Sequence, residues 1–311
     1  MISIIIPVYN RLQVLQRCID SVISQAFDGL ELIIIDDFSQ DSTEEYLLQL
    51  VNKYPFIKIS LNYKNYGVNY SRNRGIELAS KKFILFLDSD DELGQGSLAR
   101  IIDVLTNNPD TKHFLFIVSD RGNEFNYLKK PVSIQYEDWV SARVSGDFTH
   151  VICATTMKKY LFFEEFRMFE HLNWLRVKKE TSPQLLVPLV TTQRERNRSD
   201  SLTLSSRLKT FSGIKAKFES EKLFYSMYHD DLRLYNPSSL TFKLVKTIFL
   251  GVACDQKSDC KVLILYAKGL HIKLLASLIM LIPSSLLKYG IIKYCNIKRR
   301  YAIKYLSFAY N

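Results

Sequence analysis

The chain has 311 residues, 47% of them hydrophobic, which is enough to bury the core of one large domain or of two small ones. Its charged fraction of 24% excludes wholesale disorder. The net charge of +10 is concentrated in residues 260–311, which contain nine Lys or Arg and no Asp or Glu, so the nearly neutral remainder argues against a nucleic-acid-binding protein.

Strand-like and helix-like segments alternate along the first 118 residues. Short apolar runs predict strands, and apolar residues spaced three and four apart predict helices. The predicted strands are 3–8, 31–35, 57–61, 83–87 and 114–118, and the predicted helices are about 12–23, 42–54, 69–79 and 98–105. Asn10 and the pair Ser42 and Glu45 have the spacing of helix N-terminal caps. Continuous apolar strands that alternate with helices predict a parallel sheet covered on both faces.

The cysteines give no sign of a metal site. The five cysteines, at positions 18, 153, 254, 260 and 295, form no CxxC pair and lack zinc-site spacing. Their odd number, and an N-terminus without the features of a signal peptide, predict reduced thiols in a cytoplasmic protein.

Polar clusters follow three of the predicted strands. They are Tyr9-Asn10, Asp36-Asp37 and the run Asp88-Ser89-Asp90-Asp91. Ligands of open α/β sheets bind at the carboxyl ends of the strands. Several carboxylates at one strand end repel each other unless a cation offsets them, and Mg²⁺ or Mn²⁺ shared with substrate phosphates fits such oxygen ligands. A solvated acidic turn is the alternative, but Asp36-Asp37 at another strand end favours a nucleotide site.

Four ordered motifs resemble those of family-2 glycosyltransferases with the GT-A fold. They are Ile-Ile-Ile-Pro-Val-Tyr-Asn at 4–10, Ile-Asp-Asp-Phe-Ser-Gln-Asp at 35–41, Asn65-x-Gly67 followed by Ser-Arg-Asn-Arg-Gly at 71–75, and Phe-Leu-Asp-Ser-Asp-Asp at 86–91. The resemblance is strong over about residues 1–105 and looser to about 205. Neither GxGxxG nor GxxxxGK[ST] occurs, so dinucleotide and P-loop sites are disfavoured.

The resemblance implies a role for each matching residue at the donor site. Pro7, Tyr9 and Asp37 would line the nucleobase pocket, with Asp37 accepting a hydrogen bond from the base. Arg72 would lie near the sugar or the diphosphate, and Asp88 near the ribose. Simple chain punctuation at Pro7 and a surface position for Arg72 are the structural alternatives.

The same resemblance implies a divalent cation, Mn²⁺ or Mg²⁺, at the end of the fourth strand. Asp90 would hold the cation that bridges the diphosphate. Asp91 would be a second or alternative ligand.

The catalytic base is predicted between two neighbours, Glu170 and His171. Members of the family often carry Glu-Asp before an apolar helix, and here the counterpart is Glu170-His171, after Phe163-Glu164-Glu165. A base must take the proton of the acceptor hydroxyl, which a carboxylate or an imidazole can do. A His in place of the usual Asp also fits an inactive enzyme.

A polar segment at 193–201, Gln-Arg-Glu-Arg-Asn-Arg-Ser-Asp-Ser, follows the predicted base. Related enzymes carry a basic loop there that closes over the donor, which implies a donor-binding role for Arg196. Arginine pairs bidentately with phosphate. The alternative is an exposed charged loop.

The C-terminal part, 240–311, combines apolar runs with regular Lys and Arg. Residues 274–287 are uncharged but include Pro283 and are too few for a comfortable membrane span. This pattern predicts helices in the membrane interface, with Lys and Arg towards anionic lipid. A helical subdomain packed on the sheet and a dimerisation surface are the alternatives.

The sequence therefore predicts an α/β protein: a GT-A-like, mostly parallel sheet between helices at 1–210, and a basic, mostly helical region at 211–311. The expected reaction is inverting transfer of a sugar from a nucleoside diphosphate donor, UDP-sugar by resemblance, to an acceptor hydroxyl of a cell-surface or lipid-linked glycan. The expected location is cytoplasmic, peripheral on the inner face of the cell membrane. The rival functions are a non-catalytic nucleotide-binding or scaffold protein and a nucleotidyltransferase.

Overall fold

The computed structural model describes residues 1–166, 169–194, 210–267 and 269–293. The chain forms two compact units. The first comprises 1–139 and 143–198, and the second comprises 140–142 and 199–311.

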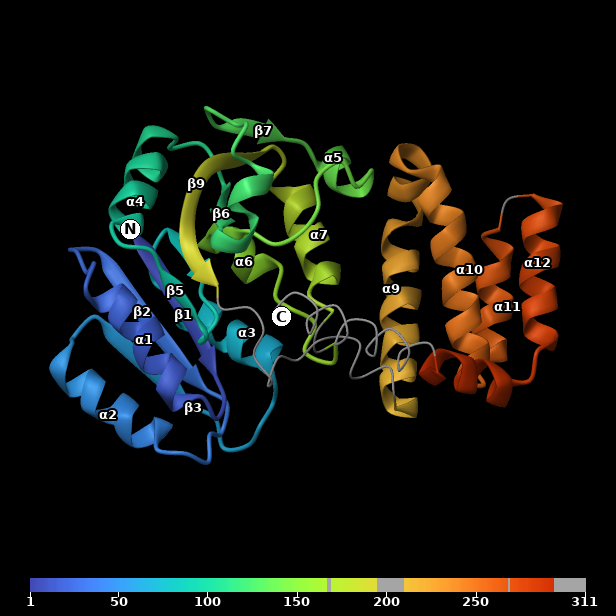
Figure 1. Cartoon of the computed structure of the whole chain (residues 1–311), viewed down its shortest axis with the longest axis horizontal. Coiled ribbons are helices and arrows are strands. Elements are labelled where there is room, and N and C mark those ends of the chain that lie inside the picture. The colour runs from blue at the N-terminus through green and yellow to red at the C-terminus, as the bar shows by residue number, and fades with distance from the viewer. Residues whose placement is uncertain (167–168, 195–209, 268, 294–311) are drawn as a thin grey trace, which may run out of the picture. The chain divides into compact units, whose positions relative to one another are not determined.

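The first unit is built on a nine-stranded sheet (Figure 1). Its strand order is β3 (Ile57–Leu61), β2 (Leu30–Asp36), β1 (Ile2–Val8), β4 (Phe83–Phe86), β8 (Thr149–Cys153), β6 (His113–Val118), β9 (Gln184–Arg194) and β5 (Asp91–Leu93), with β7 (Val132–Ile134) also paired to β9. The first four strands pair in parallel, as predicted, whereas β8, β5 and β7 run antiparallel to their neighbours. β6 and β9 also pair in parallel, so the predicted mostly parallel sheet is confirmed, and the three antiparallel strands are the feature that the sequence pattern did not predict.

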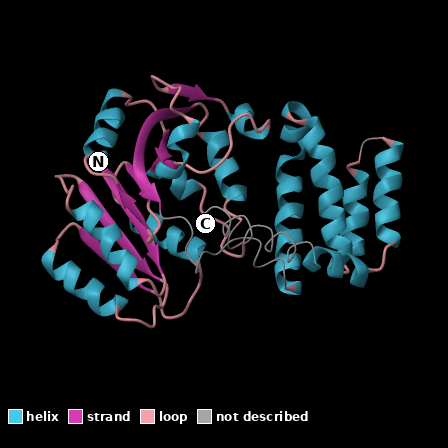
Figure 2. Cartoon of the chain, viewed as in Figure 1, coloured by secondary structure: helices cyan, strands magenta, loops and turns pink. Residues whose placement is uncertain are grey.

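Helices cover both faces of this sheet, which confirms the predicted layers (Figure 2). The helices and one 3₁₀ helix of the unit are α1 (Leu12–Ile23), α2 (Thr43–Lys53), α3 (Val68–Leu78), α4 (Ser97–Asn107), η1 (Ser119–Glu124), α5 (Tyr136–Val140), α6 (Ala154–Lys159) and α7 (His171–Glu180). Side chains alternate along a strand, so Ile4 of β1 packs with α1, α2 and α4, while Ile5 packs with α3, α6 and α7. Complete burial of one such side chain stabilises the fold by roughly 1.5–3 kcal/mol.

Gly75 explains how closely α3 approaches β1. A Cβ added at Gly75 would lie 2.4 Å from Cγ2 of Ile5, which is closer than real side chains come. The motif at 71–75 thus ends in glycine for a packing reason, and this contact fixes the position of the helix that carries Arg72.

Both predicted cap side chains act differently from the expectation. Arg11 precedes α1 as its cap residue, and the side chain of Asn10 instead accepts a hydrogen bond from the Gln40 backbone N–H at 2.6 Å. Ser42 precedes α2 but its side chain makes no cap hydrogen bond, and Asp41 instead accepts from the first N–H of the helix, that of Thr43, at 3.2 Å. Asn10 therefore ties the loop after β1 to the loop after β2.

The second unit is helical, as predicted. It contains α9 (Phe211–Tyr235), α10 (Pro237–Ala253), α11 (Lys257–Leu265), α12 (Leu270–Leu281) and a further helix at Ser284–Lys293. Its own apolar core gathers buried residues from these helices, among them Phe218, Ile248 and Cys260. A Cβ added at Gly251 would lie 2.5 Å from Sγ of Cys260, so glycine permits the close contact of α10 with α11.

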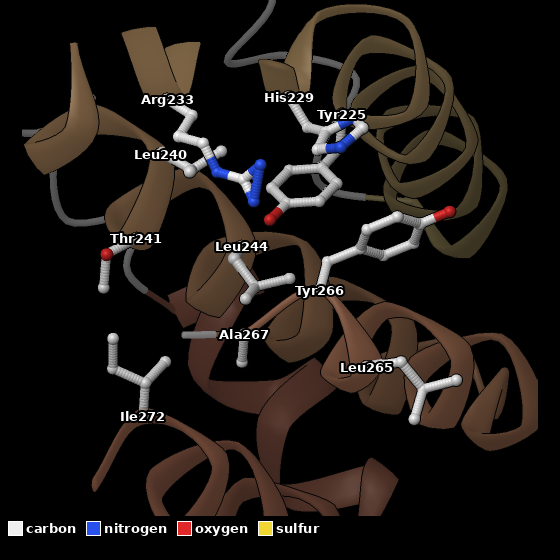
Figure 3. A pocket seen from close by; sticks show the side chains of 10 residues that line it. All are labelled: Tyr225, His229, Arg233, Leu240, Thr241, Leu244, Leu265, Tyr266, Ala267 and Ile272. Atoms are coloured by element: carbon white, nitrogen blue, oxygen red, sulfur yellow. The ribbon is translucent and has the colours of Figure 1, made fainter. Parts of the chain in front are cut away.

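A cavity of about 210 Å³ lies within the helical unit (Figure 3). Tyr225, His229 and Arg233 line it from one face of α9, since they are spaced four residues apart. Apolar side chains of the following helices, such as Leu244 and Ile272, complete the lining. The four cysteines that the structure describes are free thiols, as predicted: Cys18, Cys153, Cys254 and Cys260.

Candidate active site

The carboxyl ends of β1, β2 and β4 bring the predicted polar clusters together. These three strands are parallel neighbours, with Val8 paired to Asp36 and Ile5 to Phe86. The Asp37 backbone N–H donates to the Val8 carbonyl at 2.9 Å, which joins the ends of the first two strands. Pro7 is buried within β1, whereas Tyr9, just beyond it, is 43% exposed.

Asp37 organises the loop that leads into α3. Its Oδ1 accepts hydrogen bonds from Nδ2 of Asn62 and the backbone N–H of Tyr66, each at 2.9 Å, and its Oδ2 accepts from the Gly67 N–H at 2.6 Å. Gly67 has φ of +97°, a conformation that glycine adopts without strain. The Asp37 carboxylate keeps acceptor capacity at Oδ2, where a base N–H could bind.

Each carboxylate of the motif after β4 faces an arginine. Arg72 Nη2 lies 2.9 Å from Oδ1 of Asp88, Arg11 Nη1 lies 2.8 Å from Oδ2 of Asp90, and Arg194 Nε lies 3.4 Å from Oδ2 of Asp91. Of these three arginines, sequence reasoning assigned a role only to Arg72, although Arg194 lies within the segment 193–201 that was expected near the donor. Arg11 follows the first polar cluster directly, so its position was a usable signal. Arg194 ends β9, a strand that the sequence pattern did not predict.

The carboxylates still crowd each other. Burial raises the pKa of Asp91 to about 7, and Asp88 and Asp90 add to the rise against the effect of Arg194. Burial also opposes ionisation of Asp88, but Arg72 overrides it, so the pKa of Asp88 lies below its usual value. At Asp91, burial and the neighbouring carboxylates therefore outweigh the effect of Arg194.

This donor set fits a divalent cation in part. The residues that the structure describes contain no group of three or more His, Cys, Asp or Glu placed to hold a metal. Mg²⁺ and Mn²⁺, however, need only one or two carboxylates when substrate phosphates supply other ligands. Asp90, which is partly exposed and pairs with Arg11, can serve as such a ligand. A cation there would also offset the repulsion by which Asp88 and Asp90 add to the effect of burial on the pKa of Asp91.

Arg72 connects this edge to the predicted base. Its Nη1 lies 3.3 Å from Oε1 of Glu170, the residue that precedes α7, while Nη2 holds Asp88. The guanidinium also lies over the Phe162 ring, 5.6 Å from its centroid. One arginine of α3 thus brings a carboxylate 98 residues away in sequence to the donor edge.

Two asparagines of α3 hold the segment before Glu170. Nδ2 of Asn73 donates to the Phe162 carbonyl at 2.9 Å, and Oδ1 of Asn73 accepts from the Phe162 N–H at 2.8 Å. Nδ2 of Asn69 donates to the carbonyls of Phe163 and Phe166 at 2.9 and 3.1 Å. In the sequence, Asn73 stood out only as a member of the motif at 71–75. These hydrogen bonds explain why the motif has an asparagine at this position.

His171 begins α7 and is exposed, with its ring 6.2 Å from that of Phe169. Its neighbour Glu170 is the member of the pair that contacts Arg72. Arg196, the predicted donor-binding arginine, lies outside the residues that the structure describes.

A buried pair of histidines packs against α7. Nε2 of His113 and Nδ1 of His150 are 2.9 Å apart, and His150 stacks on Trp174 of α7 at 4.2 Å. Burial lowers the pKa of both imidazoles well below the usual value. Burial likewise lowers the pKa of Lys178 to about 7, and its amine lies 3.3 Å from the centroid of the Trp139 ring. The pair is neutral and structural, and it fixes the helix that follows Glu170.

Residues 3–167 match the family model described as Glycosyl transferase family 2. A relative from Campylobacter jejuni, named GalNAc(5)-diNAcBac-PP-undecaprenol beta-1,3-glucosyltransferase, is 34% identical over 188 residues, which cover 58% of this chain and 60% of that protein. The chain spans 26% and 55% of the length of two other curated relatives, so it matches about half of such proteins or less.

Two solved structures resemble the chain over most of its length. S. aureus TarS 1-349 in complex with UDP-GlcNAc has a TM-score of 0.58 at 14% identity, covering 97% of this chain and 92% of that one. A mannosyltransferase from Pyrobaculum calidifontis, in complex with GDP-Man and Mn2+, has a TM-score of 0.57 at 12% identity, covering 96% and 86%. At these identities the likeness shows the fold, and it confirms the predicted GT-A-like architecture.

Proposed function

The chain belongs to glycosyl transferase family 2, and from this premise we propose that it is an inverting glycosyltransferase. It would move a sugar from a nucleoside diphosphate donor, UDP-sugar, to an acceptor hydroxyl in the synthesis of a cell-surface or lipid-linked glycan. The observation that carries the proposal is the bridge from Asp88 through Arg72 to Glu170, because it places a carboxylate base beside the donor edge. The name of the C. jejuni relative, which acts on a sugar linked to PP-undecaprenol, supports the acceptor class.

The proposed donor site follows the strand ends. Asp37, at the end of β2, accepts a hydrogen bond from the nucleobase, which Pro7 and Tyr9 flank. Asp88 approaches the ribose, and Arg196 completes the site on the diphosphate. Asp37 supports this role through its remaining acceptor capacity, and Tyr9 through its exposure.

Asp90 is the proposed ligand of Mn²⁺ or Mg²⁺, with Asp91 as a second or alternative ligand. When bound, the cation supplies positive charge to the diphosphate. In that state Arg11 would exchange its contact with Asp90 for one with a phosphate oxygen.

Glu170 is the proposed base, ahead of His171. Its carboxylate takes the proton of the acceptor hydroxyl as that oxygen bonds to the anomeric carbon. The bond from this carbon to the diphosphate oxygen breaks, and the electron pair leaves with the nucleoside diphosphate. Arg72 positions Glu170, and the arginines of the edge offset charge on the leaving group. His171 is exposed at the start of α7, which makes it the second candidate.

Transfer assays test this proposal. We would incubate the chain with a panel of UDP- and GDP-sugars, with Mn²⁺ or EDTA, and measure release of nucleoside diphosphate. Asp90→Ala and Glu170→Ala should lower the rate by about 100-fold or more, and His171→Ala by less. Glu165→Ala removes an exposed carboxylate of the same segment and is the matched control. Metal-independent release, or full activity in Asp90→Ala, would contradict the proposed site.

A non-catalytic nucleotide-binding protein is the second candidate, because His171 stands where related enzymes often carry Asp. It predicts that UDP binds in the presence of Mn²⁺ but that no donor is turned over with any acceptor. The division into a catalytic domain at 1–210 and a helical region at 211–311 is part of the main proposal.

The helical region is proposed to lie peripherally on the inner face of the cell membrane. No single helix within the described parts of the chain is long and apolar enough to cross a bilayer, although α12 and the helix at 284–293, bent by 95°, pass that test as a pair. These helices expose a row of leucines: Leu270, Leu274, Leu275, Leu278, Leu281 and Leu286. Such exposed apolar surface, in a stretch with lysines and no acidic residues, suits an anionic bilayer interface.

Vesicle flotation tests the membrane contact. The chain should float with vesicles that contain phosphatidylglycerol and should bind less at high salt. Leu278→Glu should abolish flotation, whereas Leu234→Glu, on a leucine of α9 that is at least as exposed, should not. Equal flotation of the two variants would contradict the proposal that these leucines contact the membrane. A wild-type dimer that Leu278→Glu dissociates would assign the face to a second copy instead.

A further inference from the structure

A second cavity, of about 270 Å³, lies within the α/β unit. Residues of η1 and the segment after it, of β7, of the segment at 143–145 and of β9 line it. Every lining residue belongs to the same compact unit as the candidate active site. The position of the cavity relative to that site is therefore defined.

The walls of the cavity combine aromatic rings with planar charged groups. Phe125, Leu128 and Leu186 form apolar lining, and Tyr127 is 67% exposed at the cavity. Arg121 is held firmly, because its Nε and Nη2 donate to Oε2 of one glutamate, Glu124, at 3.0 and 2.7 Å. Its guanidinium also lies 4.9 Å from the centroid of the Phe125 ring.

The segment at 143–147 ties this cavity to the donor edge. Nη1 of Arg121 donates to the Asp147 carbonyl at 3.0 Å, and the Asp147 carboxylate lies 3.1 Å from Nη1 of Arg194. Arg194 in turn pairs with Asp91. A Cβ added at Gly146, where φ is +92°, would lie 2.6 Å from Arg121, so glycine permits this tight arrangement. Arg121, Asp147 and Arg194 thus link the wall of the cavity to Asp91 of the donor site.

We propose that this cavity binds a hexose ring of the acceptor glycan, beyond the sugar that carries the reacting hydroxyl. The proposal rests on the glycosyltransferase function above and extends it to the acceptor. A sugar presents C–H groups on its ring faces and hydroxyls at its edges. Aromatic faces carry partial negative charge and attract the C–H groups, while the fixed Arg121 and Glu124 pair offers donors and acceptors to the hydroxyls.

Size and polarity favour a sugar over other occupants. A volume of about 270 Å³ is below that of sites for drug-sized ligands and suits one ring. A lipid chain would leave the charged groups of Arg121, Glu124 and Arg143 without solvent or hydrogen-bonding partners from the ligand, which is costly. Arg143, the second arginine of the lining, pairs with Asp138 at 2.8 Å, so its positive charge is offset as that of Arg121 is. Because both arginines are paired, the lining suits a neutral sugar.

Acceptors of different length test the subsite. We would measure transfer to p-nitrophenyl monosaccharides and to the corresponding β-linked disaccharides of glucose, GlcNAc and GalNAc, with donor hydrolysis measured in parallel. Tyr127→Ala should raise the KM for disaccharides by about tenfold, a typical loss for one aromatic contact. The KM for monosaccharides and the rate of donor hydrolysis should not change, and Tyr127→Phe should retain most of the affinity.

Phe242→Ala, which removes an aromatic ring of similar exposure in the helical unit, is the matched control. An unchanged disaccharide KM in Tyr127→Ala would overturn the proposal, as would an equal loss for monosaccharides. Saturation-transfer NMR with the same disaccharides provides a readout that does not need turnover. If the wild type binds the disaccharides and Tyr127→Ala does not, the subsite is supported. This holds even if no donor is hydrolysed, because absent hydrolysis would refute only the proposed function. Absence of disaccharide binding to the wild type overturns the subsite.

Discussion

The two units contain charge clusters of opposite balance. In the α/β unit, five carboxylates share three arginines: Asp88 and Glu170 pair with Arg72, Asp90 with Arg11, and Asp91 and Asp147 with Arg194. In the helical unit, the buried carboxylate of Glu221 pairs with two lysines, Lys217 at 2.7 Å and Lys246 at 3.0 Å. The first cluster has an excess of acid and the second an excess of base.

The pKa values of the carboxylates in the two clusters reflect which sign of charge is in excess around them. Burial acts against ionisation in both clusters. At Glu221 the lysines prevail and lower the pKa to about 2, whereas at Asp91 the neighbouring carboxylates add to burial and the pKa rises to about 7. The comparison teaches that the lysines of the helical cluster more than offset the burial of the Glu221 carboxylate. The α/β cluster gains from an added cation, as a site for a metal and a diphosphate should.

The largest effect should come from breaking the helical cluster. Glu221→Ala removes the carboxylate that pairs with the buried Lys217 and with Lys246, and it should lower the free energy of unfolding by about 3–5 kcal/mol, measured by urea denaturation. Glu219→Ala, which breaks the more exposed pair with Lys222 on the same helix, is the control and should cost less than about 1 kcal/mol. Equal losses of stability in the two variants would show that the buried ion pairs contribute no more to the free energy of unfolding than the exposed pair does.

The pH dependence of this contribution has a definite sign. Because the pKa of Glu221 falls from 4.5 to about 2 on folding, its ionised form stabilises the native state at all pH values above the unfolded pKa. The difference between wild type and Glu221→Gln should shrink as the pH falls from 4.5 towards 2. A difference that stays constant over this range would contradict the assignment.

Asp91→Asn should have the opposite effect. Folding raises the pKa of Asp91 from 3.8 to about 7, so its charge destabilises the native state at and above neutral pH. The variant should be more stable by up to about 4 kcal/mol above pH 7, and the gain should disappear as the pH falls below 3.8, where Asp91 is protonated in both the folded and the unfolded chain. Urea denaturation at several pH values measures the gain. A loss of stability at pH 8 would show that the pair with Arg194 outweighs the repulsion.

Lys178 offers a smaller test, as a buried base outside both clusters. Burial lowers its pKa from 10.5 to about 7, so folding is penalised while the unfolded chain keeps the proton. Lys178→Met should stabilise the α/β unit by about 2 kcal/mol at pH 7, once the cation–π contact with Trp139 is allowed for. The gain should vanish as the pH approaches 10.5. A gain independent of pH would instead indicate better packing.

The sequence predicted the acidic half of the donor edge and missed most of its basic half. Asp37, Asp88, Asp90 and Asp91 follow strands, and parallel strand ends meet at one edge, so their meeting could be predicted. The partner Arg194 lies 103 residues from Asp91, at the end of a strand with no regular alternation.

The same holds for the fold: elements with a local sequence pattern could be predicted, and elements that depend on pairing with distant residues could not. The strands β1 to β4 and β6 and the four helices among the first 118 residues were predicted from apolar patterns, since each is long enough to show one. The strand β5 is only three residues, Asp-Glu-Leu, and exists because it pairs with β9. Strand direction in the second half of the sheet is likewise set by distant pairing, which no local pattern encodes.

Cooperative binding of UDP and Mn²⁺ tests the central claim most directly. Calorimetry would measure UDP affinity for the wild type and for Asp90→Ala, each with and without Mn²⁺. If the acid-rich edge awaits a cation and a diphosphate, Mn²⁺ should tighten UDP binding to the wild type by about tenfold or more and have no effect in Asp90→Ala. UDP binding that is equally tight without Mn²⁺, and unchanged in Asp90→Ala, would contradict the account.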